Sequence, residues 1–576
     1  MEVQFQEKPC LVEAGRGFSV SYKGRFLYSK YSPERAIEGT VSSLEILPNT
    51  LILAFSPVLW LGLSSLLQKL PENCFILGVE FDKKLYDFSK TELEKLQNKK
   101  DNISNEKLRS QTAILPFELN DYIVNILSGE EFPAKKETLQ LLPHISNFRR
   151  ALPVEMSAGT QFEKEKYIKF ASLTQNTIAS FWKNRITLTR LGRLFSKNLF
   201  KNLSNLPQSL DLRKIINSIS SPIFVFGAGE SIEETLNNIP KSEIHKCFII
   251  AVDAAATSLK AHNIKIDAIV AVESQLAIEK AYIGNTAKNS LLIADITSRK
   301  AVTRHSKNTA YFASKYTDAQ FLRKLSHETF FPPLFPPLGS VGLTAVQLAL
   351  LLRKNKNIPV FFSGLDFSFS CGRTHANNTP AHIARLCSSD RLHSQENYTA
   401  AFKTEAKLIT GKNNIPVYTD TALTGYAKSF TDVFSGSPNL YDAGKQGLFL
   451  SIPEISSEKL TAYLKTTVKK ETMDFSNLQG LEIIKTPDIL SFLEAEEKAL
   501  NRIKELLMFG KDVACCSCSL EEELQSLIAP REYLYLHFPD GYKCNTKDIS
   551  FLKRVRSQID FFLKDIKNEL KTDATD

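Results

Sequence analysis

The chain of 576 residues is 43% hydrophobic and 23% charged, which is ordinary for a soluble globular protein with enough apolar side chains for several cores. At about 150 residues per domain, the length predicts roughly three or four domains. The 72 basic residues barely exceed the 63 acidic ones, so the net charge is only +9. This balance permits an anionic small-molecule ligand, and we expect no nucleic-acid partner.

The first residues and the cysteines indicate a cytoplasmic protein. The opening segment MEVQFQEKPC has neither a basic n-region nor an apolar h-region, so we expect no secretory signal. Nine cysteines are present, and the crowded run Cys515-Cys516-Ser517-Cys518 has no partner cluster at the spacing of zinc ligands. We therefore expect reduced, structural thiols and no metal site.

The first region, residues 1–150, is predicted to be an α/β domain with one βαβ unit. Residues 51–68 are uncharged, but Pro57 interrupts them, and the pattern favours strand, turn, helix and strand over a membrane span. We expect no stable membrane insertion. Glu80 ends the second strand, where dinucleotide folds place a ribose-binding acid. The first turn, residues 55–59, lacks the glycine that close approach to a pyrophosphate requires, so this domain predicts a degenerate nucleotide site.

Residues 151–214 are predicted to be a basic helical connector. Between residues 166 and 210 there is no Asp or Glu, and apolar side chains recur at helical spacing: Leu188, Leu191, Phe195 and Leu199. One interpretation is a helix that binds a membrane surface or an acidic partner. The favoured interpretation is a helix that packs on the next domain and has a solvated basic face.

Residues 215–448 alternate strand and helix patterns, which predicts a Rossmann-like, mostly parallel sheet covered on both faces. The predicted strands are IFVFGAG, CFIIAVDA, DAIVAVES, SLLIADI, AYFAS and PVFFSGLDF. From residue 449 to 576 the sequence is helical and charged. The predicted fold is therefore α/β, with an N-terminal α/β domain and a C-terminal mainly helical domain on either side of the central one.

The turn Gly227-Ala228-Gly229 follows the first central strand and opens a helix, and we predict that this turn, together with Glu230 and Ser231, binds the nucleotide. Glycines allow unusual φ angles and close backbone approach, and a helix N-terminus suits an anion such as a nucleotide phosphate. Two features favour a simple turn instead. Ser231 and Glu234 have the spacing of a capping box, and Glu230 places a negative charge at the helix start.

Further candidates for nucleotide binding follow later strands. Asp253 and Glu273 end the next two predicted strands, and Asp253 lies about where a ribose partner is expected. Gly339 and Ser340 open a second glycine-rich helix start in LGSVGLTAVQLA, which is a second candidate anion site. The alternative for this segment is tight packing of a helix on a strand.

Candidate catalytic residues follow the strand PVFFS. Asp366 ends that strand, and Arg373 and His375 come shortly after it. Ligands of open α/β sheets collect beyond the carboxyl ends of the strands. His375 is therefore a candidate general base, which Asp366 could orient; His382 and His393 are the nearest substitutes.

These segments, in this order, resemble the motility-associated factor (Maf) flagellin glycosyltransferases. The blocks that carry the resemblance are GRFLYSKYSPER, FGAGES, AVDAAATSL, IDAIVAVES, LGSVGLTAVQLA, FFSGLDFSF, THA, VYTDTALTGYAKSF and NLYDAGKQG. The resemblance implies transfer of a nonulosonic acid of the pseudaminic or legionaminic type from its CMP conjugate to Ser or Thr hydroxyls of flagellin. It also implies a central domain similar to bacterial sialyltransferases. The family usually has Pro where this chain has Glu230, and a glycine-rich N-terminal turn that is missing here.

The residues agree with a CMP donor. No Asp-x-Asp motif occurs, so the metal–diphosphate clamp of many sugar transferases is absent, whereas CMP leaves as a phosphate monoester. We expect no required cofactor. Two alternatives remain. One is a pterin pyrophosphokinase-like transferase, which would share the central domain. The other is a non-catalytic flagellin chaperone or assembly factor.

Overall fold

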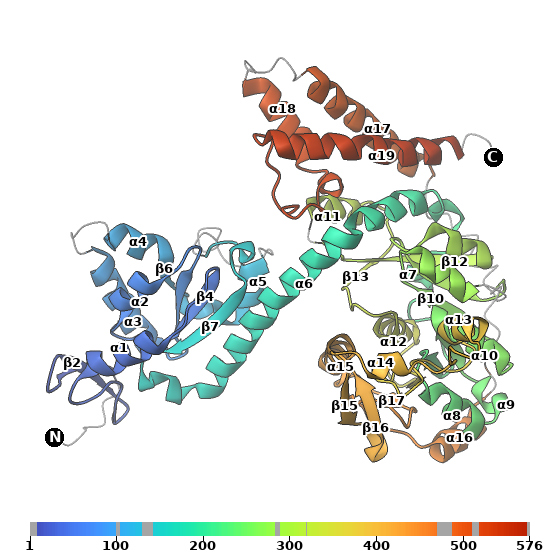
Figure 1. The fold of residues 1–576 in the computed structure, drawn as a ribbon, viewed down its shortest axis with the longest axis horizontal. Helices are drawn as coiled ribbons and strands as arrows, with labels where there is room; N and C mark the ends of the chain where they lie inside the picture. Colours follow the sequence, from blue (N-terminus) through green and yellow to red (C-terminus); the bar gives the residue numbers. More distant parts are fainter. Residues whose placement is uncertain are drawn as a thin grey trace. The chain divides into compact units, whose positions relative to one another are not determined.

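The computed structural model describes residues 8–98, 104–128, 142–282, 288–317, 319–468, 470, 486–509 and 518–572. The chain divides into two compact units, Met1–Thr187 and Leu188–Asp576, which we call unit 1 and unit 2 (Figure 1). The long helix α6 (Lys164–Leu203) begins in unit 1 and ends in unit 2. Cys515 and Cys516 lie outside the described residues, and the six cysteines for which the structure gives a state are free.

Unit 1 is built on a parallel sheet in the strand order β6-β5-β4-β7. The strands are β4 (Thr50–Phe55), β5 (Phe75–Val79), β6 (Thr112–Ile114) and β7 (Arg150–Glu155). Helix α2 (Leu63–Lys69) lies between β4 and β5, so the predicted strand–turn–helix–strand order is confirmed. β7 pairs with β4, although the sequence analysis placed residues 151–155 in the connector. Only Val154 of this strand is fully buried, so its pattern gave little strand signal.

Both faces of this sheet are covered. Along β4, Leu51, Leu53 and Phe55 pack into one apolar core, and Ile52 and Ala54 pack into another. The remaining elements of unit 1 are β1 (Cys10–Glu13), β2 (Phe18–Tyr22), β3 (Arg25–Phe26), α1 (Pro33–Ser43), α3 (Lys83–Asn98), α4 (Ser104–Gln111) and α5 (Ile123–Ser128). Among the described residues of the whole chain, no helix is both long and apolar enough to cross a membrane.

Unit 2 contains an eight-stranded sheet in the order β13-β12-β11-β10-β9-β8-β14-β17, and every pairing in it is parallel. The predicted α/β class with a mostly parallel central sheet is therefore confirmed. The strands are β8 (Ile223–Phe226), β9 (Phe248–Val252), β10 (Ala268–Ala271), β11 (Leu291–Asp295), β12 (Asn308–Ser314), β13 (Leu334–Phe335), β14 (Val360–Ser363) and β17 (Leu440–Asp442). The sequence analysis missed β13 and β17, which have two and three residues.

Alternate side chains of the large sheet enter two different cores. In β11, Leu291 and Ile293 belong to one core, and Leu292 and Ala294 belong to the other. The second core also contains side chains of α6 and of the C-terminal helices α17 (Thr486–Phe509), α18 (Cys518–Ile528) and α19 (Ile549–Thr572). The C-terminal part of the chain is thus helical, and its apolar side chains share this core with α6 and with one face of the sheet.

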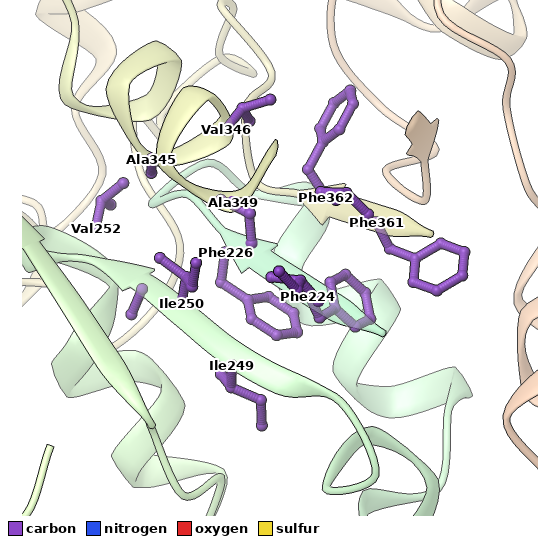
Figure 2. Close-up of a cluster of buried hydrophobic side chains, with 14 of the residues drawn as sticks. Phe224, Phe226, Ile249, Ile250, Val252, Ala345, Val346, Ala349, Phe361 and Phe362 are labelled. Atoms are coloured by element: carbon purple, nitrogen blue, oxygen red, sulfur yellow. The ribbon is translucent and has the colours of Figure 1, made fainter. Parts of the chain in front are cut away.

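Helix α12 (Val341–Leu352) covers strands on the side of the first core, where it contacts β8, β9, β10 and β14. Figure 2 shows Ala345, Val346 and Ala349 of this helix beside the strands. Phe224 and Phe226 stack in the same cluster, with ring centroids 4.2 Å apart. The small side chains of α12 let the helix axis approach the strands closely, which fixes the position of its N-terminus.

The remaining helices and strands of unit 2 surround this sheet. They are α7 (Leu212–Ile215), α8 (Ser231–Asn238), α9 (Lys241–Ile244), α10 (Ala256–Ala261), α11 (Gln320–Ser326), α13 (Pro380–Ser388), α14 (Tyr398–Ala401), β15 (Lys407–Thr410), β16 (Pro416–Thr419), α15 (Thr421–Phe434) and α16 (Ser457–Thr466). The segment from α13 to α15 is inserted between β14 and β17.

Candidate functional site

The candidate site lies at the carboxyl ends of β8 and β14. Strands β9 to β13 lie in order on one side of β8, and β14 and β17 lie on its other side, so the strand order reverses between β8 and β14. In open α/β sheets, ligands bind beyond the carboxyl ends of the strands at such a reversal. The turns that follow these two strands are the predicted GAG turn and residues 364–366.

The GAG turn packs directly against the turn after β14. The N–H of Gly227 donates to the Ser363 carbonyl at 2.8 Å, and the N–H of Gly229 donates to the Gly364 carbonyl at 2.9 Å. A Cβ on Gly227 would lie 2.1 Å from the carbonyl oxygen of Gly364. The glycines are therefore required for close approach of two backbones. These two N–H groups are not free for a phosphate, so the predicted phosphate contact of the turn depends on its other atoms, such as those of Ala228.

The expectation of unusual φ angles in this turn is wrong for Gly227 and Gly229, because neither has a positive φ. The glycine with a positive φ is Gly364, on the opposing turn, at +76°. A residue with a side chain would be strained there.

Asp366 binds the start of α8. Its Oδ2 accepts the Ser231 N–H at 2.9 Å, and its Oδ1 accepts the Ser231 hydroxyl. The predicted capping box is therefore wrong: Ser231 is the first residue of the helix, and Glu234 pairs with Lys445 at 3.0 Å. Asp366 instead provides the negative group that the positive end of a helix favours. Its place at this helix start leaves α8 a poor site for a phosphate.

Asp366 does not orient His375, as the sequence analysis had suggested, because both of its oxygens are bonded to Ser231. The carboxyl is buried, and burial raises its pKa to about 6. It therefore belongs to the framework that joins β14 to α8, and it lies two residues after Gly364.

The start of α12 lies beside the same turns. Ser340 is the N-cap, and its Oγ accepts the Gly342 N–H at 3.3 Å. A Cβ on Gly342 would lie 2.5 Å from Leu365, and a Cβ on Gly227 would lie 2.6 Å from the same side chain. Leu365 thus brings the second glycine-rich helix start next to the first. Gly339 is exposed with a φ of +73°, and the first turn of α12 contains no acid. This helix start suits an anion better than that of α8 does.

Asp253 and Glu273 follow the neighbouring strands β9 and β10. Asp253 is buried, its Oδ1 accepts the N–H of Ala254 at 2.6 Å, and burial, with a contribution from Glu273, raises its pKa to about 6. Glu273 is exposed and accepts the N–H of Gln275 at 2.9 Å. The predicted positions at strand ends are confirmed, whereas contact of either residue with a nucleotide stays a prediction.

Helix α6 occupies the carboxyl ends of the strands next to Glu273. The side-chain amide of Asn198 donates to the carbonyls of Ser274 and Thr297, both at 3.0 Å. The amide of Asn202 donates to the carbonyls of Ile296 and Ser298, both at 2.8 Å. Both asparagines are buried. The ends of β10 and β11 are therefore closed by this part of α6, which agrees with the packed-helix interpretation of residues 188–203.

The loop after β14 is fastened to the first turn of α8. Glu230 accepts the N–H of Ser370 at 2.8 Å and its hydroxyl at 2.7 Å. Glu233 pairs with the guanidinium of Arg373 at 2.7 Å, and it accepts the side-chain amide of Asn377 at 3.0 Å. Glu230 therefore binds a loop of the protein itself, although the sequence analysis placed it among the nucleotide-binding residues.

His375 lies in this loop, directly before Ala376, whose N–H donates to the Ala228 carbonyl at 2.9 Å. The imidazole is exposed, and its Nδ1 lies 3.1 Å from the Thr374 hydroxyl. Surrounding protein reduces its hydration and lowers its pKa from the ordinary value. The loop thus holds an exposed, neutral histidine next to Ala376, the residue that is hydrogen-bonded to the GAG turn.

The two neighbouring histidines have other contacts. His382 Nδ1 accepts the N–H of Asn378 at 3.1 Å, at the start of α13. His393 is exposed and pairs with Asp390 of its own turn at 2.9 Å. Of the three, His375 is the one whose position beside the GAG turn is fixed by the fold.

Sequence reasoning missed a buried ion pair between Lys412 and Asp442, behind Asp366. Both side chains are 3% exposed, and Lys412 also donates to the Gly444 carbonyl at 3.2 Å. The positive charge of Lys412 partly offsets the effect of burial on the pKa of Asp366. The signal was present in the block NLYDAGKQG, where a strand-end Asp precedes a glycine, but the partner lysine is 30 residues away.

The other predicted strand-end acid, Glu80 of unit 1, is bonded within the protein. Its carboxylate accepts the hydroxyls of Ser56 at 2.7 Å and Tyr167 at 2.6 Å, and it is 1% exposed. Burial raises its pKa despite these bonds. The turn that follows β4 is strained, since Val58 has a φ of +27° and Trp60 has a φ of +52°. Within the described residues of both units, no three His, Cys, Asp or Glu side chains form a group that could hold a metal ion.

Three comparisons relate the chain to known proteins. Residues 196–372 match the family model described as 6-hydroxymethylpterin diphosphokinase MptE-like. Among solved structures, the chain is similar to the Maf glycosyltransferase from Magnetospirillum magneticum AMB-1, with a TM-score of 0.47 and 15% identity, over 98% of this chain and 90% of that one.

An uncharacterised protein of Treponema pallidum (strain Nichols) is 31% identical to this chain over 575 residues. The match covers 96% of this chain and 94% of the relative, so it includes both units and the C-terminal helices. The chain belongs to the same family as this Treponema pallidum protein.

Proposed function

We propose that unit 2 is a glycosyltransferase that moves a nonulosonic acid of the pseudaminic or legionaminic type from its CMP conjugate to Ser or Thr hydroxyls of flagellin. The observation that carries the proposal is the convergence of the blocks that resemble the Maf proteins. FGAGES, LGSVGLT and FFSGLDF are far apart in the sequence, and their turns contact one another at the reversal between β8 and β14. NLYDAGKQG joins them through Ala443, whose N–H donates to the Phe362 carbonyl of FFSGLDF at 2.8 Å.

The proposed reaction uses the exposed groups at this place. The anion of the donor lies at the start of α12, beside Gly339 and Ser340, where the helix presents N–H groups and no acid. As the bond from the anomeric carbon to the phosphate oxygen breaks, the acceptor hydroxyl forms a bond to that carbon. His375 takes the hydroxyl proton, because an exposed imidazole with a lowered pKa is neutral at pH 7. CMP is the leaving group.

Intact-mass analysis of flagellin tests this proposal. Flagellin from cells that lack the protein should be lighter than wild-type flagellin by whole nonulosonic acid residues. Purified protein with the CMP conjugate should restore that mass. Flagellin of unchanged mass in the deletion strain would contradict the proposal.

The rival functions give different results in the same material. A pterin pyrophosphokinase is favoured by the description of the matching family model, and it would consume ATP in the presence of a hydroxymethylpterin. A flagellin chaperone would leave the flagellin mass unchanged and lower the amount of assembled flagellin.

A further inference from the structure

The loop that contains His375 is attached to α8 by acidic side chains that the proposed reaction does not use. Two of the three acids at the start of α8, Glu230 and Glu233, accept hydrogen bonds from the loop, whereas Glu234 pairs with Lys445. Carboxylates that accept N–H and O–H donors form charge-assisted bonds, which are about twice as strong as neutral ones. We infer that Glu230 and Glu233 are positioning residues that hold the loop Ser370–Asn377, and with it His375, over the GAG turn.

The contacts fix the loop on both sides of the histidine. Glu230 binds Ser370, five residues before His375, through both the N–H and the hydroxyl. Glu233 binds Arg373 before it and Asn377 after it. Between these points, the Ala376 N–H donates to the Ala228 carbonyl. A segment held at four places around one residue cannot shift that residue without breaking several bonds.

The identity of residue 230 supports this role. Glu230 is partly buried, and its carboxylate points to Ser370 rather than into solvent. The charge also lies at the positive end of α8, which lowers the cost of holding two carboxylates near each other.

The inference rests on the proposed function for its kinetic part, but the attachment of the loop can be measured separately. Hydrogen exchange of residues 370–377 in the full-length protein reports the attachment. In Glu230→Ala and Glu233→Ala, the amides of this loop should exchange at least about tenfold faster. Glu230→Gln keeps an acceptor for the Ser370 N–H, so it should restore slow exchange. Glu234→Ala, in the same helical turn, is the matched control and should leave exchange unchanged.

Transfer kinetics then report the position of His375. A misplacement of about 1 Å can slow a positioned reaction by about a hundredfold, so Glu230→Ala should lower kcat by roughly 10- to 100-fold. The KM for the CMP donor should change little, because the α12 start does not depend on these acids. Glu230→Gln should recover most of the lost kcat. Unfolded protein would also lower the apparent kcat at an unchanged KM, so kcat is expressed per folded molecule, and its loss should persist after this correction.

The outcomes separate the two proposals. If the wild type transfers no sugar but the alanine variants free the loop, the proposed function fails and the attachment stands. If the wild type transfers sugar and the alanine variants change neither loop exchange nor kcat, the positioning role is overturned and the proposed function stands. Fast exchange with an unchanged kcat would also overturn it, because the loop would then be anchored without any effect on His375.

Discussion

The two parallel sheets of this protein each have a buried acid beyond the end of a strand, and the surroundings of the two acids differ. Glu80 follows β5 in unit 1, and Asp366 follows β14, beside the reversal of strand order, in unit 2. Burial raises the pKa of both carboxyls. Each also binds a serine of the neighbouring turn, Ser56 in unit 1 and Ser231 in unit 2. A buried strand-end acid is thus a framework element in both units.

What differs is the surroundings of the acid. In unit 1, Tyr167 covers Glu80, and the adjoining turn has a strained Val58 in place of glycine. In unit 2, glycines bring two turns and a second helix start together, and His375 is exposed beside them. The comparison teaches that glycine turns and an exposed base distinguish the candidate site, because the buried acids are alike.

Replacement of His375 should have the largest effect. His375→Ala removes the proposed general base, so transfer should slow by roughly 10²–10⁴-fold while CMP binding is nearly unchanged. Titration calorimetry with CMP and a transfer assay measure the two quantities. The matched control is His393→Ala, an exposed histidine that pairs with Asp390 in its own turn.

Full transfer activity in His375→Ala would show that an exposed base at this position is not what distinguishes unit 2 from unit 1. If His382→Ala were then the slow variant, the role of the base would move along the loop. If all three histidine variants were active, the acceptor proton would be taken by another group.

Much of the fold of unit 2 could be predicted from the sequence, because its long buried strands are continuous apolar runs that end in glycine or an acid. IFVF and FIIAV are examples, and their ends correctly place Gly227 and Asp253 on one edge. β13 and β17 were missed because they are short, and β7 was missed because only one of its side chains is fully buried.

The contacts of the site could be predicted less well. Ser231 and Glu234 have the spacing of a capping box, but Asp366, 135 residues after Ser231, accepts the hydrogen bond at the helix start instead. Glu230 likewise bonds to Ser370, 140 residues later. Local spacing cannot reveal which distant partner competes for a side chain, so the positions of the residues were predictable and their partners were not.

The pH dependence of stability tests whether Asp253 is buried as a protonated group. Its pKa is about 6 in the folded protein, above the ordinary value of 3.8, so the folded state keeps a proton that the unfolded state loses. The contribution of this group is therefore fully present below about pH 4 and is lost as the pH rises through 6. Two pKa units correspond to about 3 kcal/mol.

Asp253→Asn should remove this dependence. The free energy of unfolding of the variant, relative to wild type, should rise by up to about 3 kcal/mol between pH 4 and pH 8, as measured by urea unfolding. The matched control is Asp432→Asn, at an exposed position of α15. A constant difference between the variant and wild type across this range would show that folding does not raise the pKa of Asp253.

The next-largest effect is expected from Gly229→Ala, because the GAG turn is closely packed. A Cβ on Gly229 would lie 2.5 Å from the Asp366 carboxylate, so Gly229→Ala must push the two turns apart. The expected loss is about 1–3 kcal/mol in the free energy of unfolding, together with weaker CMP binding. Gly425→Ala is the matched control, because no atom lies within 4 Å of its Cβ position and alanine favours a helix. A Gly229→Ala protein as stable as wild type would contradict the close contact of the turns.

The smallest effect is expected from Tyr167→Phe, which removes one of the hydrogen bonds to Glu80 in unit 1. The Tyr167 hydroxyl donates to Glu80 at 2.6 Å, and its removal leaves a buried carboxyl with one donor fewer. The free energy of unfolding should fall by about 1–2 kcal/mol, and thermal unfolding should begin at a lower temperature. Tyr31→Phe, at a side chain that is 82% exposed, should leave stability unchanged. Because Glu80 is proposed to support the fold and not the reaction, the transfer rate of folded Tyr167→Phe protein should equal that of wild type. A loss of transfer without a loss of stability would place a functional group in unit 1 and remove the distinction between the two sheets.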